Sequence, residues 1–157
     1  MKSSTKASII TVIGNVASGK STLLSLLESE MKIQGVAADN LFQVSDPFAK
    51  PFLSDMKRWS FTNELWLTAE RAKLLRRELR KDAKGLVFVD SGLLMSWVYT
   101  YSHFLVGNIT PDEWSFYLDL YDVLTNDILY EVKVIRLNYY VDTLMSRLQK
   151  RARDYEL

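Results

Sequence analysis

A glycine-rich segment near the start of the chain carries the residues best suited to chemistry. It reads Gly14-Asn-Val-Ala-Ser-Gly-Lys-Ser21 and matches the pattern G-x-x-x-x-G-K-[ST] at every position. Glycines let the backbone fold into a concave nest of N–H groups that binds phosphate oxygens. The lysine neutralises the β- and γ-phosphates, and the last serine offers its hydroxyl to Mg²⁺.

The segment therefore predicts a binding site for a purine nucleoside triphosphate together with Mg²⁺. Two alternatives stay open: a glycine turn with a chance lysine, and a loop that binds nucleotide without turnover. The residues expected to contact the nucleotide are Gly14, Asn15, Val16, Ala17, Ser18, Gly19, Lys20, Ser21 and Thr22.

A basic run near the end of the sequence narrows the class of protein. A small GTPase would need D-x-x-G and N-K-x-D motifs, and the sequence has neither in the required places. An ATPase motor would be longer and would need a catalytic glutamate after the strand that ends at Asp90. Nucleoside and nucleotide kinases suit the length, and they need a mobile basic segment that closes over the phosphates. Arg147, Arg151 and Arg153 supply such a segment, unless they form an ordinary solvated helix face.

The elements that must position these residues alternate between strand and helix. Apolar runs predict strands at residues 7–13, 86–89 and 132–137, with a weaker strand at 36–44. Helical spacing predicts helices over residues 19–33, 60–81, 91–106, 110–129 and 141–153, with loop and short helix over 45–59. A capping box begins at Thr110. Alternation of this kind predicts an α/β fold, a P-loop NTPase three-layer sandwich with a parallel sheet, in a single domain over residues 1–157.

Composition excludes several other function classes. With 157 residues and 48% hydrophobic content the chain can bury a core, and its net charge of +1 gives no basic field for nucleic acid. The lack of cysteine and the single histidine, His103, exclude disulfides, thiol nucleophiles and multi-histidine metal sites. No apolar run approaches the roughly 20 residues of a membrane span. We therefore expect no nucleic-acid or membrane partner and a cytoplasmic location.

Several segments together carry a family resemblance. The first set is Asp46-Pro47, Lys50-Pro-Phe-Leu53, Arg58-Trp-Ser-Phe61, Glu64 and Arg71. The second set is Asp90 and the closing run Arg147-x-x-x-Arg151-x-Arg153-x-x-Glu156. In order, they resemble the E-P, N-P-F-L … R-W-x-F-x-x-Q-x-x-x-x-x-x-R, (D/E)-R-S and lid R-x-x-x-R-x-R-x-x-E motifs of deoxynucleoside kinases. The resemblance implies ATP- and Mg²⁺-dependent phosphorylation of the 5′-hydroxyl of a deoxynucleoside.

The resemblance also implies a role for each matched residue. Asp46 would take the proton from the nucleoside 5′-hydroxyl, and Asp90 would hold Mg²⁺ opposite Ser21. Lys20 and the lid arginines Arg147, Arg151 and Arg153 would clamp the transferring phosphoryl group. The remaining matches would contact the nucleoside: Glu64, Arg71 and Glu156. The alternatives are an Asp-Pro turn for Asp46, a helix N-cap for Asp90 and a solvated surface arginine for Arg71.

Three departures from the family pattern leave the acceptor open. Glu64 replaces the base-reading glutamine, Ser91 the arginine of D-R-S, and Ser96 an aspartate six residues after the acid. One hypothesis is an altered base preference, because an ionised carboxylate only accepts hydrogen bonds and suits the donor edge of guanine. A second is lost catalysis in a nucleotide-binding scaffold. A third is a nucleoside monophosphate acceptor, met by Arg71 or Arg58.

Two further expectations concern assembly and length. The resemblance implies a homodimer, formed through the aromatic-rich helices predicted at residues 91–106 and 110–129. The family continues beyond the lid with another strand and helices, whereas this sequence stops at Leu157. We therefore expect that the part after the lid is missing from this sequence, either because the sequence is a fragment or because it is a minimal version whose strand is absent or comes from a partner.

Overall fold

A parallel sheet organises the molecule. The computed structural model describes residues 8–31, 34–36, 46–80, 86–126, 128 and 133–151. The strands of this described part are β1 (Ser8–Gly14), β2 (Gln34–Val36), β3 (Leu86–Asp90) and β4 (Lys133–Leu137). They pair in parallel in the order β2-β3-β1-β4. The predicted α/β fold with a parallel sheet is confirmed.

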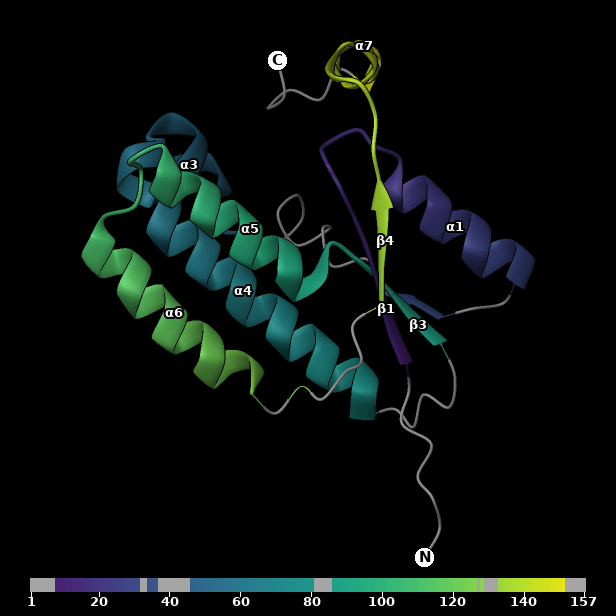
Figure 1. The fold of residues 1–157 in the computed structure, drawn as a ribbon, viewed down its shortest axis with the longest axis horizontal. Helices are drawn as coiled ribbons and strands as arrows, with labels where there is room; N and C mark the ends of the chain where they lie inside the picture. The colour runs from purple at the N-terminus through teal and green to yellow at the C-terminus, as the bar shows by residue number, and fades with distance from the viewer. Residues whose placement is uncertain are drawn as a thin grey trace, which may run out of the picture.

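Helices cover both faces of this sheet and give it three layers. The helices are α1 (Lys20–Met31), α3 (Ala49–Ser54), α4 (Met56–Arg80), α5 (Gly92–Leu105), α6 (Pro111–Thr125) and α7 (Val141–Arg151). Figure 1 shows α1 on one side of the sheet, α4, α5 and α6 on the other, and α7 beyond the carboxyl end of β4. Within the described residues, no helix combines the length and apolar character needed to cross a membrane.

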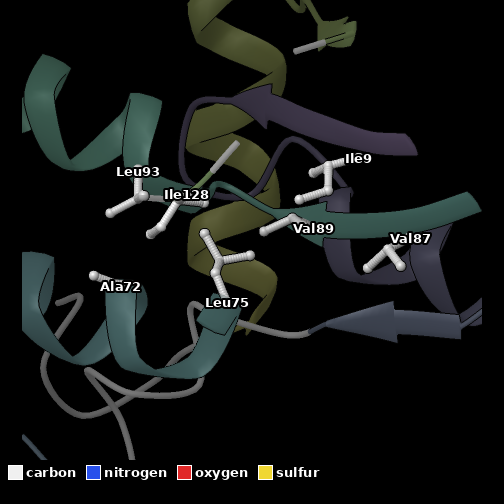
Figure 2. Close-up of a cluster of buried hydrophobic side chains, with 7 residues drawn as sticks. All are labelled: Ile9, Ala72, Leu75, Val87, Val89, Leu93 and Ile128. Carbon is white, nitrogen blue, oxygen red and sulfur yellow. The ribbon is translucent and has the colours of Figure 1, made fainter. Parts of the chain in front are cut away.

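Two apolar clusters, one on each face, hold the sheet between its helices. On the α4 and α5 side, Ile9, Val87 and Val89 of the strands pack with residues of the helices (Figure 2). The helical and loop members of this cluster are Ala72, Leu75, Leu93 and Ile128. On the α1 side, the buried members are Val12, Leu24 and Phe88. Because successive strand side chains point to opposite faces, β1 and β3 supply both clusters, which fixes the strand ends that carry the site.

Several element boundaries differ from the sequence-based prediction. Helix α4 begins at Met56 rather than near residue 60, because the Asp55 carboxylate accepts a hydrogen bond from the Arg58 N–H at 3.0 Å and caps the helix. Helix α6 ends at Thr125 rather than near residue 129, where the chain turns to bury Ile128 in the core. Of the strand predicted at residues 36–44, only residue 36 lies in β2, and residues 37–45 lie outside the described part.

One predicted boundary is confirmed in atomic detail. The Thr110 hydroxyl accepts from the Glu113 N–H at 3.2 Å, and the Glu113 carboxylate accepts from the Thr110 N–H at 2.8 Å. This reciprocal pair is a capping box, and it sets the start of α6.

Candidate active site

The glycine-rich loop joins the carboxyl end of β1 to the start of α1, and its first glycine has no room for a side chain. A Cβ added to Gly14 would lie 2.6 Å from the Ser18 Oγ and 2.8 Å from the Leu137 carbonyl oxygen. Gly19 has a φ of +89°, in the region that favours glycine. The buried Ser18 Oγ has no hydrogen-bond partner among the described residues. The loop is thus a tight backbone cradle with an unsatisfied polar atom, which fits the binding of phosphate oxygens.

Lys20 supplies the charge of this loop. Its Nζ donates to the carbonyl oxygens of Gly14 and Asn15, at 2.9 and 3.0 Å. The residue is 8% exposed and begins α1, so the ammonium group and the positive end of the helix dipole act on the same volume. This arrangement attracts an anion of high charge.

Ser21 and Asp90 form the candidate magnesium site beside the loop. The Ser21 Oγ donates to the Asp90 Oδ2 at 3.0 Å, and the second Asp90 oxygen accepts from the Ser91 Oγ at 3.0 Å. No group of three or more His, Cys, Asp or Glu that could hold a metal occurs within the described ranges. A hydroxyl and one carboxylate fit Mg²⁺, which binds proteins through one or two carboxylates and takes its other ligands from phosphates and water.

The strand-to-helix turn that follows Asp90 positions this carboxylate. Ser91 and Gly92 both have positive φ, 60° and 54°. The Ser91 N–H donates to the Val12 carbonyl oxygen at 2.9 Å, which ties the turn to β1. The N-cap residue of α5 is Ser91, so the alternative interpretation of Asp90 as the helix N-cap is wrong.

The predicted lid helix, α7, contacts the phosphate loop through its first arginine. The Arg147 Nη1 donates to the Ala17 carbonyl oxygen at 3.4 Å, and its guanidinium lies 4.2 Å from the ring centre of Tyr139. Arg151 is exposed at the end of α7, whereas Arg153 and Glu156 lie outside the described residues. A small hollow between loop and lid is lined by Gly14, Asn15, Arg136, Leu137, Asn138, Tyr139 and Leu144.

Asp46 uses its two carboxylate oxygens differently. The Oδ1 accepts from the Phe48 N–H at 2.8 Å and forms a local turn, as the alternative interpretation predicted. The Oδ2 is buried and has no hydrogen-bond partner in the described part of the chain. Burial raises the pKa of Asp46, while the Phe48 and Ala49 N–H groups and the Arg71 charge oppose the rise. One oxygen therefore builds the turn and the other is available to take a proton.

Arg71 lies inside the protein and not on its surface. It is 3% exposed, and its Nη1 donates to the Ser96 Oγ at 2.7 Å, joining α4 to α5. The alternative interpretation as a solvated helix arginine is therefore wrong. Ser96 stands at the position where the family resemblance predicts an aspartate. The Arg71 guanidinium therefore donates to a neutral hydroxyl and not to a carboxylate.

Glu64 is the most perturbed acid of this region. Burial raises its pKa to about 7, partly opposed by the Arg71 charge and reinforced by that of Asp46. Its Oε2 has no hydrogen-bond partner among the described residues, and its Oε1 lies 4.0 Å from the Nε2 of His103. We refer to Asp46, Glu64, Arg71, Ser96 and His103 as the acceptor cluster.

Two members of this region were missed by the sequence analysis. His103 was used only to exclude metal sites, and Asn63, which is fully buried with both amide atoms unpartnered in the described part, was not considered. His103 follows Ser96 by seven residues, which places both on one face of α5, and this spacing could have revealed it. The packing of α5 against α4 could not be read from either helix alone.

The raised pKa of Glu64 predicts a pH-dependent stability that needs no ligand. A carboxyl whose pKa is higher in the folded than in the unfolded state stabilises the fold at low pH, and this contribution falls as pH rises toward the folded value. Between pH 4.5 and 7 we expect the wild type to lose about 3 kcal/mol of unfolding free energy relative to Glu64→Gln. Urea unfolding of both proteins across this range measures the difference. A constant difference would contradict the assignment.

Comparison with known proteins gives the family. Residues 10–157 match the family model described as deoxynucleoside kinase. Deoxyadenosine/deoxycytidine kinase of Bacillus subtilis is 28% identical over 155 residues, which cover 97% of this chain and 69% of the relative. Deoxyguanosine kinase of the same organism is 24% identical over 152 residues, covering 96% and 70%. Deoxycytidine kinase 2 of Gallus gallus is 28% identical, with 94% and 66% covered.

Solved structures agree with this result at the level of the fold. Deoxyadenosine kinase from M. mycoides with bound dATP superimposes with a TM-score of 0.78 at 22% identity, covering 95% of this chain and 74% of that one. The same enzyme with bound dCTP gives a TM-score of 0.75 at 23% identity, with 94% and 72% covered. The fold and the family resemblance predicted from the sequence are thus confirmed, and the chain belongs to the deoxynucleoside kinase family.

Proposed function

We propose that the chain transfers the γ-phosphoryl group of ATP to the 5′-hydroxyl of a deoxynucleoside in the presence of Mg²⁺. The proposal is carried by one observation: a single short segment, residues 90–96, contacts both the phosphate loop and the acceptor cluster. Asp90 contacts Ser21 of the phosphate loop, and six residues later Ser96 contacts Arg71 of the acceptor cluster. The two halves of a phosphotransfer site are therefore joined through a single strand-to-helix connection.

In this proposal the protein residues act on the two sides of the transferred group. Lys20 and the N–H groups of the loop bind the β- and γ-phosphates, and Arg147 and Arg151 approach from the lid. Ser21 and Asp90 would hold Mg²⁺, which neutralises charge on the phosphate oxygens when it is bound.

The acceptor side supplies the base. As the 5′-oxygen forms its bond to the γ-phosphorus, its proton passes to the Asp46 Oδ2 and the bond between the γ-phosphorus and ADP breaks. A carboxylate is sufficient for this step, because the transition state of phosphoryl transfer is loose and demands little basicity.

Four expectations from the sequence analysis extend this proposal. We propose a homodimer formed through α5 and α6, supported by the exposed apolar residues Tyr101, Leu105, Val106 and Phe116. The single-domain organisation and the cytoplasmic location stay predictions. Arg153 and Glu156 would complete the lid.

A panel assay tests the function. The four deoxynucleosides and their 5′-monophosphates are each incubated with ATP and Mg²⁺, and products are separated by chromatography. We expect a deoxynucleoside to be converted to its 5′-monophosphate, no monophosphate to be consumed, and EDTA to stop the reaction. Consumption of a monophosphate would support the monophosphate-kinase alternative. Binding of ATP without turnover of any acceptor would support the scaffold alternative.

A further inference from the structure

A buried tyrosine on α6 lies beside the acceptor cluster, and the proposed phosphoryl transfer makes no use of it. Tyr117 is the largest fully buried side chain in the described part of the chain. Its ring stacks on that of Trp114, with 5.8 Å between ring centres, and lies 5.8 Å from the ring of Tyr121. The ring is thus fixed by its neighbours on α6, while its hydroxyl oxygen reaches α4 and lies 3.0 Å from the Thr68 Oγ1.

The other contact of Thr68 determines the direction of this hydrogen bond. The Thr68 hydroxyl donates to the Glu64 carbonyl oxygen at 2.7 Å, and a carbonyl oxygen can only accept. Because a threonine hydroxyl has a single proton, the Thr68 Oγ1 must accept from Tyr117. Burial raises the pKa of Tyr117, so the phenol keeps the proton that it donates. We call this directed path, from Tyr117 through Thr68 to the Glu64 carbonyl, the hydroxyl chain.

The hydroxyl chain ends on the part of α4 that carries two members of the acceptor cluster. Glu64, Thr68 and Arg71 follow one another at spacings of four and three residues, so they share one face of the helix. None of the three is more than 5% exposed. The charges of Glu64 and Arg71 both act on the Tyr117 phenol, so this face of α4 is turned toward α6. Thr68 is therefore the point at which α6 holds it.

Helix α5 repeats the arrangement on its own buried face. Ser96 and Thr100 are four residues apart, and the Thr100 hydroxyl donates to the Ser96 carbonyl oxygen at 2.8 Å. Thr100 is fully buried and lies close enough to Tyr117 to lower the pKa of the phenol. Arg71 of α4 donates to the Ser96 Oγ at 2.7 Å. Tyr117 thus lies next to one threonine of each helix, at the level where Arg71 joins the two.

Hydroxyl groups are a costly choice for the middle of a helix interface. Apolar side chains would fill the same space without partners, whereas a buried hydroxyl that loses its hydrogen bond destabilises the fold. A hydroxyl that donates to the carbonyl four residues earlier also tends to bend a helix. A satisfied network of buried hydrogen bonds, in return, favours one arrangement of the helices that it joins.

We propose that Tyr117 is a positioning residue for nucleoside binding: acting through Thr68, it sets the position of the α4 segment that carries Glu64 and Arg71. In this role it contacts no substrate atom. Without the phenol hydroxyl, the Thr68 Oγ1 loses its donor and α4 is free to shift against α5. The phosphate loop lies on other elements, so the ATP side of the site should not respond. The inference rests on the proposed function for its substrate class.

Binding of the two substrates to Tyr117→Phe tests the proposal, because this variant loses the hydroxyl and keeps the ring. Calorimetry gives the Kd of ATP and of whichever of the four deoxynucleosides the wild type binds most tightly. We expect the deoxynucleoside Kd to rise about tenfold, the size of effect that one hydrogen bond allows, and the ATP Kd to stay within about twofold. In steady-state kinetics the deoxynucleoside KM should rise by the same factor, with kcat within about twofold of the wild type.

A second tyrosine on α6 is the matched control. The Tyr121 hydroxyl also joins α6 to a neighbouring helix, where it donates to the Leu93 carbonyl oxygen of α5 at 3.1 Å. Tyr121→Phe should keep the wild-type Kd for the deoxynucleoside, and thermal unfolding of both variants measures any loss of stability separately. Equal weakening of ATP and deoxynucleoside binding in Tyr117→Phe, or the same weakening in Tyr121→Phe, would overturn the proposal.

Variants of Thr68 test the hydroxyl chain from its other end, also if Tyr117→Phe does not fold. Thr68→Val removes the acceptor and should weaken deoxynucleoside binding as Tyr117→Phe does, whereas Thr68→Ser keeps the hydroxyl and should retain the wild-type Kd. Because both changes break one chain, the double variant should bind no more weakly than either single variant. Effects that multiply, or equal Kd values for Thr68→Val and Thr68→Ser, would refute the chain.

A third pair of outcomes separates this inference from the proposed function. An unchanged deoxynucleoside Kd in Tyr117→Phe, with phosphorylation by the wild type, would refute the inference and leave the function standing. Selective weakening in Tyr117→Phe, without phosphorylation by the wild type, would refute the function and leave the inference intact. A wild type that binds no deoxynucleoside would overturn both.

Discussion

Replacing Lys20 with alanine is expected to lower kcat/KM by about 10³-fold or more. Lys20 is 8% exposed, and its ammonium group donates to the carbonyl oxygens of Gly14 and Asn15 beside the start of α1. Its charge opposes the negative charge that develops on the phosphate oxygens. Release of ADP, followed in a coupled assay with the preferred deoxynucleoside, measures the loss.

A second lysine serves as the matched control. Lys73 lies on α4 with a side chain that is 69% exposed. Lys73→Ala therefore removes an ammonium group that lies in solvent, and this variant should retain wild-type turnover. Thermal unfolding of both variants checks that the Lys20→Ala protein is folded. Turnover of a folded Lys20→Ala protein within tenfold of the wild type would show that the phosphates bind elsewhere.

Asp46→Asn is expected to lower kcat by about 10²- to 10⁴-fold with little change in KM, the range found for general bases. Asparagine keeps an acceptor oxygen for the Phe48 N–H and so preserves the turn, but it cannot take the proton of the 5′-hydroxyl. Steady-state kinetics with the preferred deoxynucleoside separate the two constants. An unchanged kcat would exclude Asp46 as the base.

The pH profile gives a second measurement of the same residue. Since the base must be ionised, wild-type kcat/KM should fall as the pH drops through the raised pKa of Asp46. The acid limb should be absent in Asp46→Asn. Asp55→Asn is the matched control, because Asp55 also accepts a backbone N–H, at the start of α4, yet lies outside the acceptor cluster. Its profile should follow the wild type.

Contiguous sequence motifs predicted the phosphate side of the site better than the acceptor side. The loop from Gly14 to Ser21 is one segment with its own conformational requirements, so its pattern predicts its shape and position. Strand β3 was predicted equally well, because a buried parallel strand is a short apolar run in the sequence. Asp90 marks the end of this strand.

The acceptor cluster depends on contacts between elements that no local pattern encodes. The charged stretch around Arg71 resembles a solvated helix face, and only the packing of α4 on α5 buries its guanidinium against Ser96. The same packing brings Glu64 toward His103, a pairing between residues 39 positions apart in the numbering. The start of α4 was misplaced for a simpler reason: the capping aspartate, Asp55, lies outside the apolar periodicity.

Helix α5 has a consequence for how such an enzyme can diversify. Its first residues follow Asp90, which contacts Ser21 of the phosphate loop, whereas His103 near its far end belongs to the acceptor cluster. At 1.5 Å per residue, the step from Ser96 to His103 is about 10 Å of rigid rod. Substitutions near His103 can therefore change the acceptor cluster while the turn at Asp90 keeps its geometry. A single-residue insertion within α5 would instead rotate one end against the other by about 100° and uncouple them.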